Sequence, residues 1–273
     1  MGGAFPRSES GRSYAVGARD GRTLANAALA SRKDVRDAVV AARRAQPAWA
    51  VATAYNRGQV LYRVAEMLEG RRAQFVDDLV VGEGLAVDAA IAAVDMSVDR
   101  LVWYAGWSDK VAQVAGSANP VSGPYFDFSI PEPTGVVGVL APQESSLLGL
   151  VSVVAPVIAT GNAAVVVASE ALPLPALDLA EVLATSDLPG GVVNILTGRT
   201  AELAPVLAAH RDVDALDLAG APEGLDAELE EAAADNVKRV LRRRPGSNWS
   251  SEPSPARMLF FVEVKTVWHP LGV

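Results

Sequence analysis

Residues 131–142 read PEPTGVVGVLAP, and they open the stretch that decides the fold. The stretch continues through VIATGNAAVVVASE at residues 157–170 and DLPGGVVNILTG at residues 187–198, and it closes on DVDALDLAGAP at residues 212–222. Each segment contains a short run rich in β-branched or other apolar residues, and chain long enough for a helix separates one run from the next. The four runs are Val136–Leu140, Val165–Val167, Val192–Leu196 and Ala215–Leu218. Such runs mark parallel strands buried on both faces, so the sequence predicts an α/β fold with a doubly wound, Rossmann-like sheet.

Helices are expected between and before these strands. The crossover helices of the sheet should span Ser145–Thr160, Pro173–Ser186 and Ala201–His210. Ser31 and Asp34 form a capping box, in which the serine hydroxyl accepts a first-turn N–H and the acid lies at the helix N-terminus. The helix that begins there should end near Pro47, and a second helix should span Asn56–Glu69. Ala86–Val114 is interpreted as one long helix or a broken pair.

The remaining chain is expected to be less regular. Residues 1–30 are rich in Gly and Arg and suit a hairpin or an extended arm. Residues 116–133 should form a loop followed by an edge strand around Tyr125–Phe128. Glu223–Val237 is interpreted as an acidic helix and Lys238–Arg244 as a solvated basic tail beside it, whereas residues 248–256 are interpreted as disordered or loop-like.

Composition narrows the possible functions. A net charge of −8 provides no field that favours nucleic acid or an anionic membrane. The 273 residues contain no cysteine, which excludes thiolate chemistry, cysteine-ligated zinc and disulfides. Residues 1–30 have no signal-peptide pattern, and the apolar run Leu147–Thr160 is too short to span a bilayer. We therefore expect a cytoplasmic protein that binds neither nucleic acid nor membrane.

Standard site motifs are missing. The sequence contains neither GxGxxG nor the phosphate-binding GxxxxGK[ST] pattern. Its two histidines, His210 and His269, lie far apart in the chain, so we expect no histidine metal site. Arg242–Arg244 could bind phosphate or nucleic acid, but a solvated tail beside an acidic helix is the better interpretation.

The order and spacing of four motifs nevertheless resemble those of one family. The motifs are PxGVVGVxAP at 133–142, GNxxVVxxSE at 161–170, LPxGVVNxxTG at 188–198 and HxDVDxxxxxG at 210–220. Together they resemble the cofactor-binding half of the aldehyde dehydrogenase superfamily, which can be followed along residues 31–221. EVKTVWHPLG at residues 263–272 resembles the family's C-terminal strand. The resemblance implies a Rossmann-like sheet that binds NAD or NADP without GxGxxG.

The family's site residues are altered in this sequence. Glu144 occupies the position of the family's oxyanion asparagine, where a carboxylate would repel an oxyanion. In the family's KPSE motif the lysine is replaced, whereas Ser169 and Glu170 remain. We take Ser169, Glu170 and the glycine turns at Gly198 and Gly220 as the cofactor-binding candidates. No catalytic residue and no metal ligand is assigned.

The family's cysteine nucleophile and its glutamate base have no counterpart here, so we expect the catalytic domain to be absent. The chain resembles the shortened, cysteine-less second unit of the two-domain (family 16 type) aldehyde dehydrogenases. On this reading residues 1–240 form a cofactor-binding domain, and residues 241–273 form a tail with an oligomerisation-type strand. The domain divides into an arm at 1–30, a helical part at 31–115 and a βαβ core at 133–222.

Three functions remain open at this point. The first is a non-catalytic (pseudoenzyme) subunit, a homo-oligomer or a hetero-oligomer with a complete aldehyde dehydrogenase. The second is a sensor module with weak or lost binding of NAD or NADP. The third is an NAD(P)-dependent oxidoreductase that acts on aldehydes itself, although covalent aldehyde oxidation needs a thiolate that this sequence does not contain.

Overall fold

The parallel sheet predicted from the four apolar runs forms the centre of the molecule. The computed structural model describes residues 1–244 and 246–272. Five parallel strands follow one another in the order β7-β6-β5-β8-β9. They are β5 (Val136–Leu140), β6 (Ala163–Val167), β7 (Val193–Leu196), β8 (Ala215–Asp217) and β9 (Arg239–Leu241). Every residue of β5, β6 and β8 is buried, which explains the uninterrupted apolar sequence of β5 and β6 and confirms the α/β prediction.

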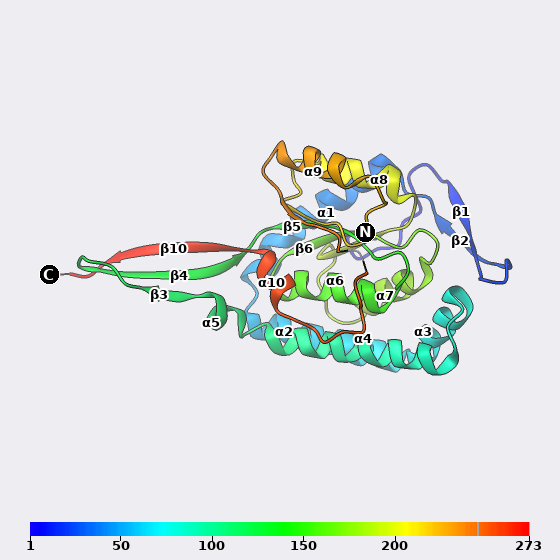
Figure 1. Ribbon diagram of the computed structural model, residues 1–273, viewed down its shortest axis with the longest axis horizontal. Coiled ribbons are helices and arrows are strands. Elements are labelled where there is room, and N and C mark those ends of the chain that lie inside the picture. The colour runs from blue at the N-terminus through cyan, green and yellow to red at the C-terminus, as the bar shows by residue number, and fades with distance from the viewer. Residues whose placement is uncertain (245, 273) are drawn as a thin grey trace.

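Helices cover both faces of the sheet (Figure 1). One face carries α2 (Ala54–Gly70), α4 (Val87–Trp107), α6 (Leu148–Ala159) and α7 (Leu174–Ala184). The other carries α1 (Arg32–Val51), α8 (Thr200–Ala208) and α9 (Asp226–Ala234). Val137 and Val139 of β5 join the first core cluster, whereas Val136 and Leu140 join the second. Alternate side chains of one strand therefore fill two separate cores.

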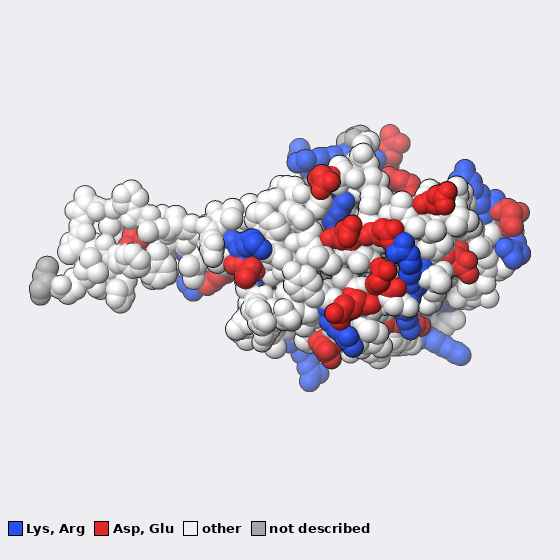
Figure 2. Space-filling view, turned by 90° about the horizontal axis from the view of Figure 1, so that it is seen from below, with Lys and Arg blue, Asp and Glu red and all other residues white. Residues whose placement is uncertain are grey.

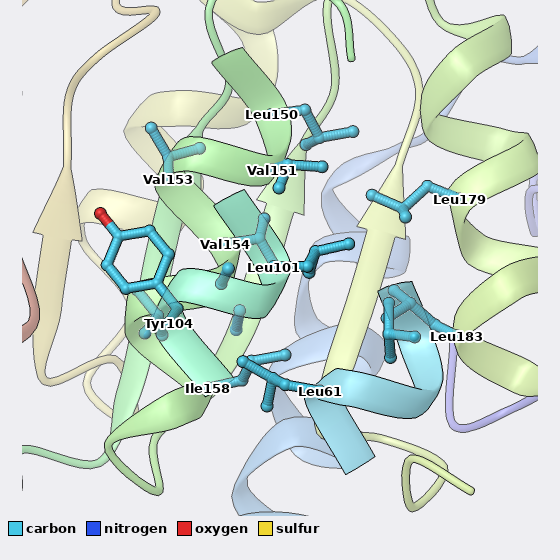
Figure 3. Packing of buried hydrophobic residues seen from close by; sticks show 14 of the residues in the cluster. Leu61, Leu101, Tyr104, Leu150, Val151, Val153, Val154, Ile158, Leu179 and Leu183 are labelled. Atoms are coloured by element: carbon cyan, nitrogen blue, oxygen red, sulfur yellow. The ribbon is translucent and has the colours of Figure 1, made fainter. Parts of the chain in front are cut away.

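The larger core lies between the sheet and the helices α2, α4, α6 and α7. Figure 3 shows Leu61 of α2, Leu101 of α4 and Ile158 of α6 packed together, with Leu179 and Leu183 of α7 on the same side. Among the described residues, no helix is long and apolar enough to cross a membrane.

Several helix boundaries differ from those expected. The capping box is present, because the Ser31 hydroxyl accepts from the N–H groups of Lys33 and Asp34 and the Asp34 carboxylate accepts from the Ser31 N–H. The predicted end of α1 near Pro47 is wrong, since the helix continues to Val51. Trp49 is buried beyond the proline, and its indole donates to the Ile158 carbonyl (2.9 Å). This tertiary contact holds the last turn despite the N–H that proline lacks.

The segment expected as one helix or a broken pair is a broken pair. It consists of α4 and of α5 (Val111–Ala115). Between α2 and α4 the chain forms α3 (Arg72–Asp78) and a π-helical turn, η1 (Leu79–Glu83). The first crossover helix begins at Leu148, three residues later than predicted, because Ser146 and Leu147 lie in a turn.

The basic segment after α9 corrects the prediction of a solvated tail. Arg239–Leu241 forms strand β9, which pairs in parallel with β8. Its side chains alternate, so that Val240 packs against the second core while Arg239 reaches Glu263 at 2.7 Å. Arg242 pairs with Glu230 of α9 at 2.7 Å, so the acidic helix does lie beside the basic residues.

A three-stranded antiparallel sheet extends from the body as an arm (Figure 1). It has the order β10-β4-β3 and consists of β3 (Ser117–Asn119), β4 (Tyr125–Pro133) and β10 (Val262–Pro270). The prediction of an edge strand at Tyr125–Phe128 is wrong, because β4 is the central strand and β10 covers its other side. Figure 2 shows few charged side chains on the arm's outer part. Its exposed apolar residues are Tyr125, Phe126, Ile130, Val264, Trp268 and Leu271.

The N-terminal residues form a hairpin, as predicted. It pairs β1 (Ser13–Gly17) with β2 (Thr23–Ala28) and lies on the side of the body opposite the arm (Figure 1). The hairpin is close to the loops that follow β6 and β7, since the Tyr14 hydroxyl donates to the Glu170 carbonyl (3.0 Å).

Residues 246–255 form an anchored loop that leads into α10 (Ala256–Phe260). Arg100 of α4 is buried and donates to the carbonyls of Trp249 (2.9 Å) and Ser251 (2.8 Å). Arg257 forms an ion pair with Asp217, whose side chain is 0% exposed. These contacts give the loop a defined path across α4 and the end of β8.

Candidate functional site

A cleft of about 580 Å³ lies where the parallel strands end. Its walls come from the loops after β5, β6, β7 and β8 and from strand β1. The lining residues include Tyr14, Gln143, Glu170, Arg199, Thr200 and Gly220. The carboxyl ends of parallel strands meet at one edge of a sheet, and this edge is the usual ligand site of doubly wound folds. The cleft is therefore the candidate functional site.

Glu170 is the carboxylate of the cleft, and both of its oxygens are engaged. Oε1 forms an ion pair with Arg199, and Oε2 accepts from the N–H of Thr200 at 3.1 Å, at the start of α8. Its backbone N–H donates to the Gln143 side chain at 2.9 Å. The carboxylate is therefore neutralised by groups of the protein before any ligand enters.

Tyr14 closes the cleft from the hairpin side. Burial, followed by the negative charge of Glu170, raises the pKa of its hydroxyl to about 12. The Arg199 guanidinium lies over the tyrosine ring, 5.7 Å from its centroid. Tyr14, Glu170 and Arg199 thus form one connected group, in which Tyr14 stays protonated at neutral pH.

Of the other residues singled out in the sequence, Gly220 lines the cleft, whereas Ser169 and Gly198 lie outside its lining. Ser169 is buried, where its hydroxyl donates to the Gln143 carbonyl (2.9 Å) and accepts from the Leu172 N–H (3.3 Å). It shapes the loop and does not line the cleft. Gly198 is also outside the lining, because it packs against the backbone of Ala30 beside the hairpin.

Gly220 lines the cleft, and its position requires glycine. A Cβ placed there would lie 1.8 Å from the carbonyl oxygen of Ala141, far inside the van der Waals distance. The Gly220 N–H donates to the Leu140 carbonyl at 2.8 Å, which ties the end of β8 to the end of β5. Glu144, in contrast, is exposed and outside the cleft lining.

The lining residues that the sequence did not indicate include Tyr14, Arg199 and Thr200. Arg199 and Thr200 directly follow the Thr197-Gly198 pair at the end of β7, so their position after a strand was a usable signal. Tyr14 comes from the hairpin, and no local pattern indicates that this strand meets the sheet edge.

The cleft lining holds one pair of opposite charges, and further charged groups lie beyond it. Arg199 is the cationic residue of the lining, and it already pairs with Glu170. Helix α9 follows Gly220, and its first turn carries Asp226 and Glu228. Neither carboxylate lines the cleft, and Asp226 pairs with Arg243 at 3.6 Å. Within residues 1–244 and 246–272, no group of three His, Asp or Glu side chains has a metal-holding arrangement.

Known proteins resemble this chain in sequence over most of its length. Residues 7–250 match the model of the aldehyde dehydrogenase family. Mitochondrial aldehyde dehydrogenase of Rattus norvegicus is 32% identical over 247 residues, which cover 89% of this chain and 47% of that protein. Cytosolic 10-formyltetrahydrofolate dehydrogenase of Mus musculus is 31% identical over 248 residues, which cover 88% of this chain and 27% of that protein. The chain thus spans about half the length of its curated relatives, or less.

Solved structures share the fold of this chain, and the chain again spans about half of each. HpcC from Thermus thermophilus is 28% identical with a TM-score of 0.83, over 88% of this chain and 46% of that chain. Betaine aldehyde dehydrogenase from Staphylococcus aureus, solved in complex with NAD+, shares the fold with a TM-score of 0.82 at 24% identity, over 88% of this chain and 48% of that chain. From the family match and the shared fold, we conclude that the chain belongs to the aldehyde dehydrogenase family.

Proposed function

We propose that this chain is a non-catalytic subunit, a pseudoenzyme that assembles in the cytoplasm with a complete NAD(P)-dependent aldehyde dehydrogenase. The absence of cysteine from the 273 residues supports the first part, because covalent aldehyde oxidation needs a thiolate nucleophile. In this proposal residues 1–240 form the cofactor-type domain, and residues 241–273 supply the strand that completes the arm.

The observation that carries the assembly role is the arm. Among the described residues, no strand pairs with the outer edge of β10, which leaves nine residues of strand with one unpaired backbone edge. Trp268 on β10 is 58% exposed and Phe126 on β4 is 50% exposed. An unpaired edge with apolar side chains favours the addition of a strand from another chain.

Co-expression with a complete aldehyde dehydrogenase of the same genome tests this proposal. We expect both chains to elute together, and light scattering should give the mass of a hetero-oligomer. Val264→Lys, on the exposed part of β10, should abolish co-elution. The matched control Val51→Lys, at the exposed end of α1, should not. A chain that stays monomeric beside every such enzyme at micromolar concentration contradicts the proposal.

A separate preparation, in which the chain is expressed without any partner, tests catalysis. The chain alone, with NAD or NADP and a small aldehyde, should give no reduced cofactor above the rate of a blank. Cofactor-dependent turnover that survives further purification would establish the oxidoreductase alternative instead.

A residual dinucleotide-binding role is the second candidate, and the cleft with Glu170 and Gly220 favours it. We infer that binding of NAD or NADP is weak or lost, because Glu170 is already paired with Arg199. Calorimetric titration should therefore show no saturation below millimolar cofactor. Submillimolar binding that Glu170→Gln removes would support the sensor function.

A further inference from the structure

A second hollow lies on the other side of the hairpin, beneath the first residues of the chain. Its volume is about 160 Å³, and it lies between residues 1–8, helix α7 and strand β7. Most of its walls are apolar: Leu177, Ala180, Leu183, Val193 and Ile195 are among them. It shares no lining residue with the cleft at the carboxyl ends of the strands.

The edge position of β7 and the small side chains around the hollow explain why it is unfilled. β7 is the edge strand of the sheet on this side, and Val193 and Ile195 on its α7-facing side remain half-buried because α7 covers them only in part. The facing helix contributes the small side chain of Ala180. Phe5 lines the hollow but is 60% exposed, so its ring does not fill the space.

The N-terminal residues cross the hollow as a strap that is fixed at both ends. At one end the Gly2 N–H donates to the Asn194 side chain at 2.8 Å. At the other end the Ser8 hydroxyl donates to Asp34 at 2.7 Å. Within the described part of the chain, residues 5–7 make no hydrogen bond to the body. The middle of the strap can therefore move while its ends stay attached.

The size and polarity of the hollow define the ligand that it can hold. An enclosed apolar cavity of about 150 Å³ takes up one benzene molecule, so a hollow of about 160 Å³ has room for one. The carboxylate in the wall, Asp34, is buried and accepts hydrogen bonds from the Ser31 N–H, the Ser8 hydroxyl and the Glu9 N–H. Burial acts to raise the pKa of Asp34, but these hydrogen bonds hold it below its usual value. This fixed negative charge disfavours anions, and the Met1 ammonium, which also belongs to the wall, is engaged by the Ala4 carbonyl at 2.7 Å.

We propose that this hollow is a binding site for one uncharged aromatic or short aliphatic molecule about the size of benzene, which enters when the strap over residues 3–7 moves aside. The site is separate from the cleft and from the arm. Its existence does not depend on the function proposed above.

Benzene is the first probe. Titration of the full chain, followed by the methyl NMR signals of Leu177 and Ile195, should show saturable shifts. Ala180→Leu fills the hollow and should weaken binding at least tenfold. The matched control Ala73→Leu, on the exposed face of α3, should bind benzene as the unchanged chain does. Absence of saturable shifts up to the solubility of benzene overturns the proposal, as does equal binding by Ala180→Leu.

A second variant covers the case in which Ala180→Leu does not fold. Ala184 is exposed at the rim of the hollow, so Ala184→Leu should fold and should still narrow the entrance. It should weaken benzene binding at least threefold, and unchanged binding contradicts the site. Benzoate tests the charge argument, because it should bind at least tenfold more weakly than benzene. Equal binding of benzoate overturns the assignment to uncharged ligands.

Discussion

Asp78 and Asp178 place two carboxyl groups side by side between α3 and α7. The Asp78 Oδ2 atom is buried and has no hydrogen-bond donor, and Asp178 can share a hydrogen bond with it only when one of the two is protonated. Burial, the Asp178 hydrogen bond and the Asp178 charge together raise the pKa of Asp78 from 3.8 to about 8. At neutral pH the folded chain therefore holds a proton that the unfolded chain releases.

This pair makes stability depend on pH. The raised pKa of Asp78 stabilises the folded chain through the bound proton. This stabilisation is fully present below pH 3.8, the pKa of Asp78 in the unfolded chain, and it is lost as the pH rises to about 8. Asp78→Asn keeps a hydrogen-bond donor and cannot ionise, so it should flatten this decline. At pH 8 it should raise the free energy of unfolding by on the order of 1 kcal/mol, discounted for partial exposure. Urea unfolding at pH 5 and pH 8 measures the difference, and Asp109→Asn at an exposed turn serves as the control.

The buried ion pair between Arg257 and Asp217 predicts a larger effect. Arg257→Met leaves the Asp217 carboxylate buried without a cationic partner, which should lower the free energy of unfolding by about 3–5 kcal/mol. As a control, Arg22→Met breaks the exposed ion pair between Arg22 and Asp20. It should change the free energy of unfolding by less than about 1 kcal/mol.

The loss could come from the unpaired charge of Asp217 or from the lost packing of the Arg257 side chain. The double variant Asp217→Leu with Arg257→Met distinguishes these two causes. It removes both charges, so it should recover most of the lost stability. A double variant as unstable as Arg257→Met alone would show that packing, and not the unpaired charge, is responsible.

At the scale of single residues, the sequence indicated only part of the candidate site. Glu170 and Gly220 lie in the cleft because they follow strands β6 and β8, and position after a strand is readable from the sequence. The ion pair of Glu170 with Arg199 could not be read in the same way, since it depends on two loops that meet through the sheet. Whether Ser169, Glu170, Gly198 and Gly220 contact a cofactor stays a prediction.

Among the elements, strands were more predictable than helix ends. The runs at 136–140 and 192–196 match β5 and β7 to within a residue, because burial on both faces leaves an uninterrupted apolar pattern. β9 was not predicted, because three residues between charged neighbours give no such pattern. Its formation depends on β8 offering an open edge.

Helix α1 provides a direct test at the scale of one element. Ser31→Ala removes the hydroxyl that accepts from the N–H groups of Lys33 and Asp34. The free energy of unfolding should fall by about 1 kcal/mol. Ser31→Asp keeps an acceptor at the cap and should retain most of the stability. Thermal unfolding followed by circular dichroism compares the two, and equal losses would show that the cap hydrogen bond contributes little.

The whole molecule combines a densely packed body with an arm that contributes little to that packing. Trp268 packs edge-on against Tyr125, 5.6 Å away, near the outer end of the arm. Trp268→Ser should therefore change the free energy of unfolding by about 1 kcal/mol or less. It should weaken association with a partner chain at least tenfold, as measured by sedimentation. Loss of both stability and association would place the arm in the folding core instead.

The pairing of β4 with β10 also requires β4 to be synthesised well before its partner strand. Pro133 pairs with Val262 and Tyr125 with Pro270, so the partners are more than a hundred residues apart in the chain. Ribosomes add roughly 5–20 residues per second, so β4 waits several seconds for its partner strand during synthesis. Through this interval the apolar side chains of Phe126, Phe128 and Ile130 have no cover from β10. The nascent chain is thus open to chaperone capture, or to premature pairing with another nascent subunit, until β10 leaves the ribosome.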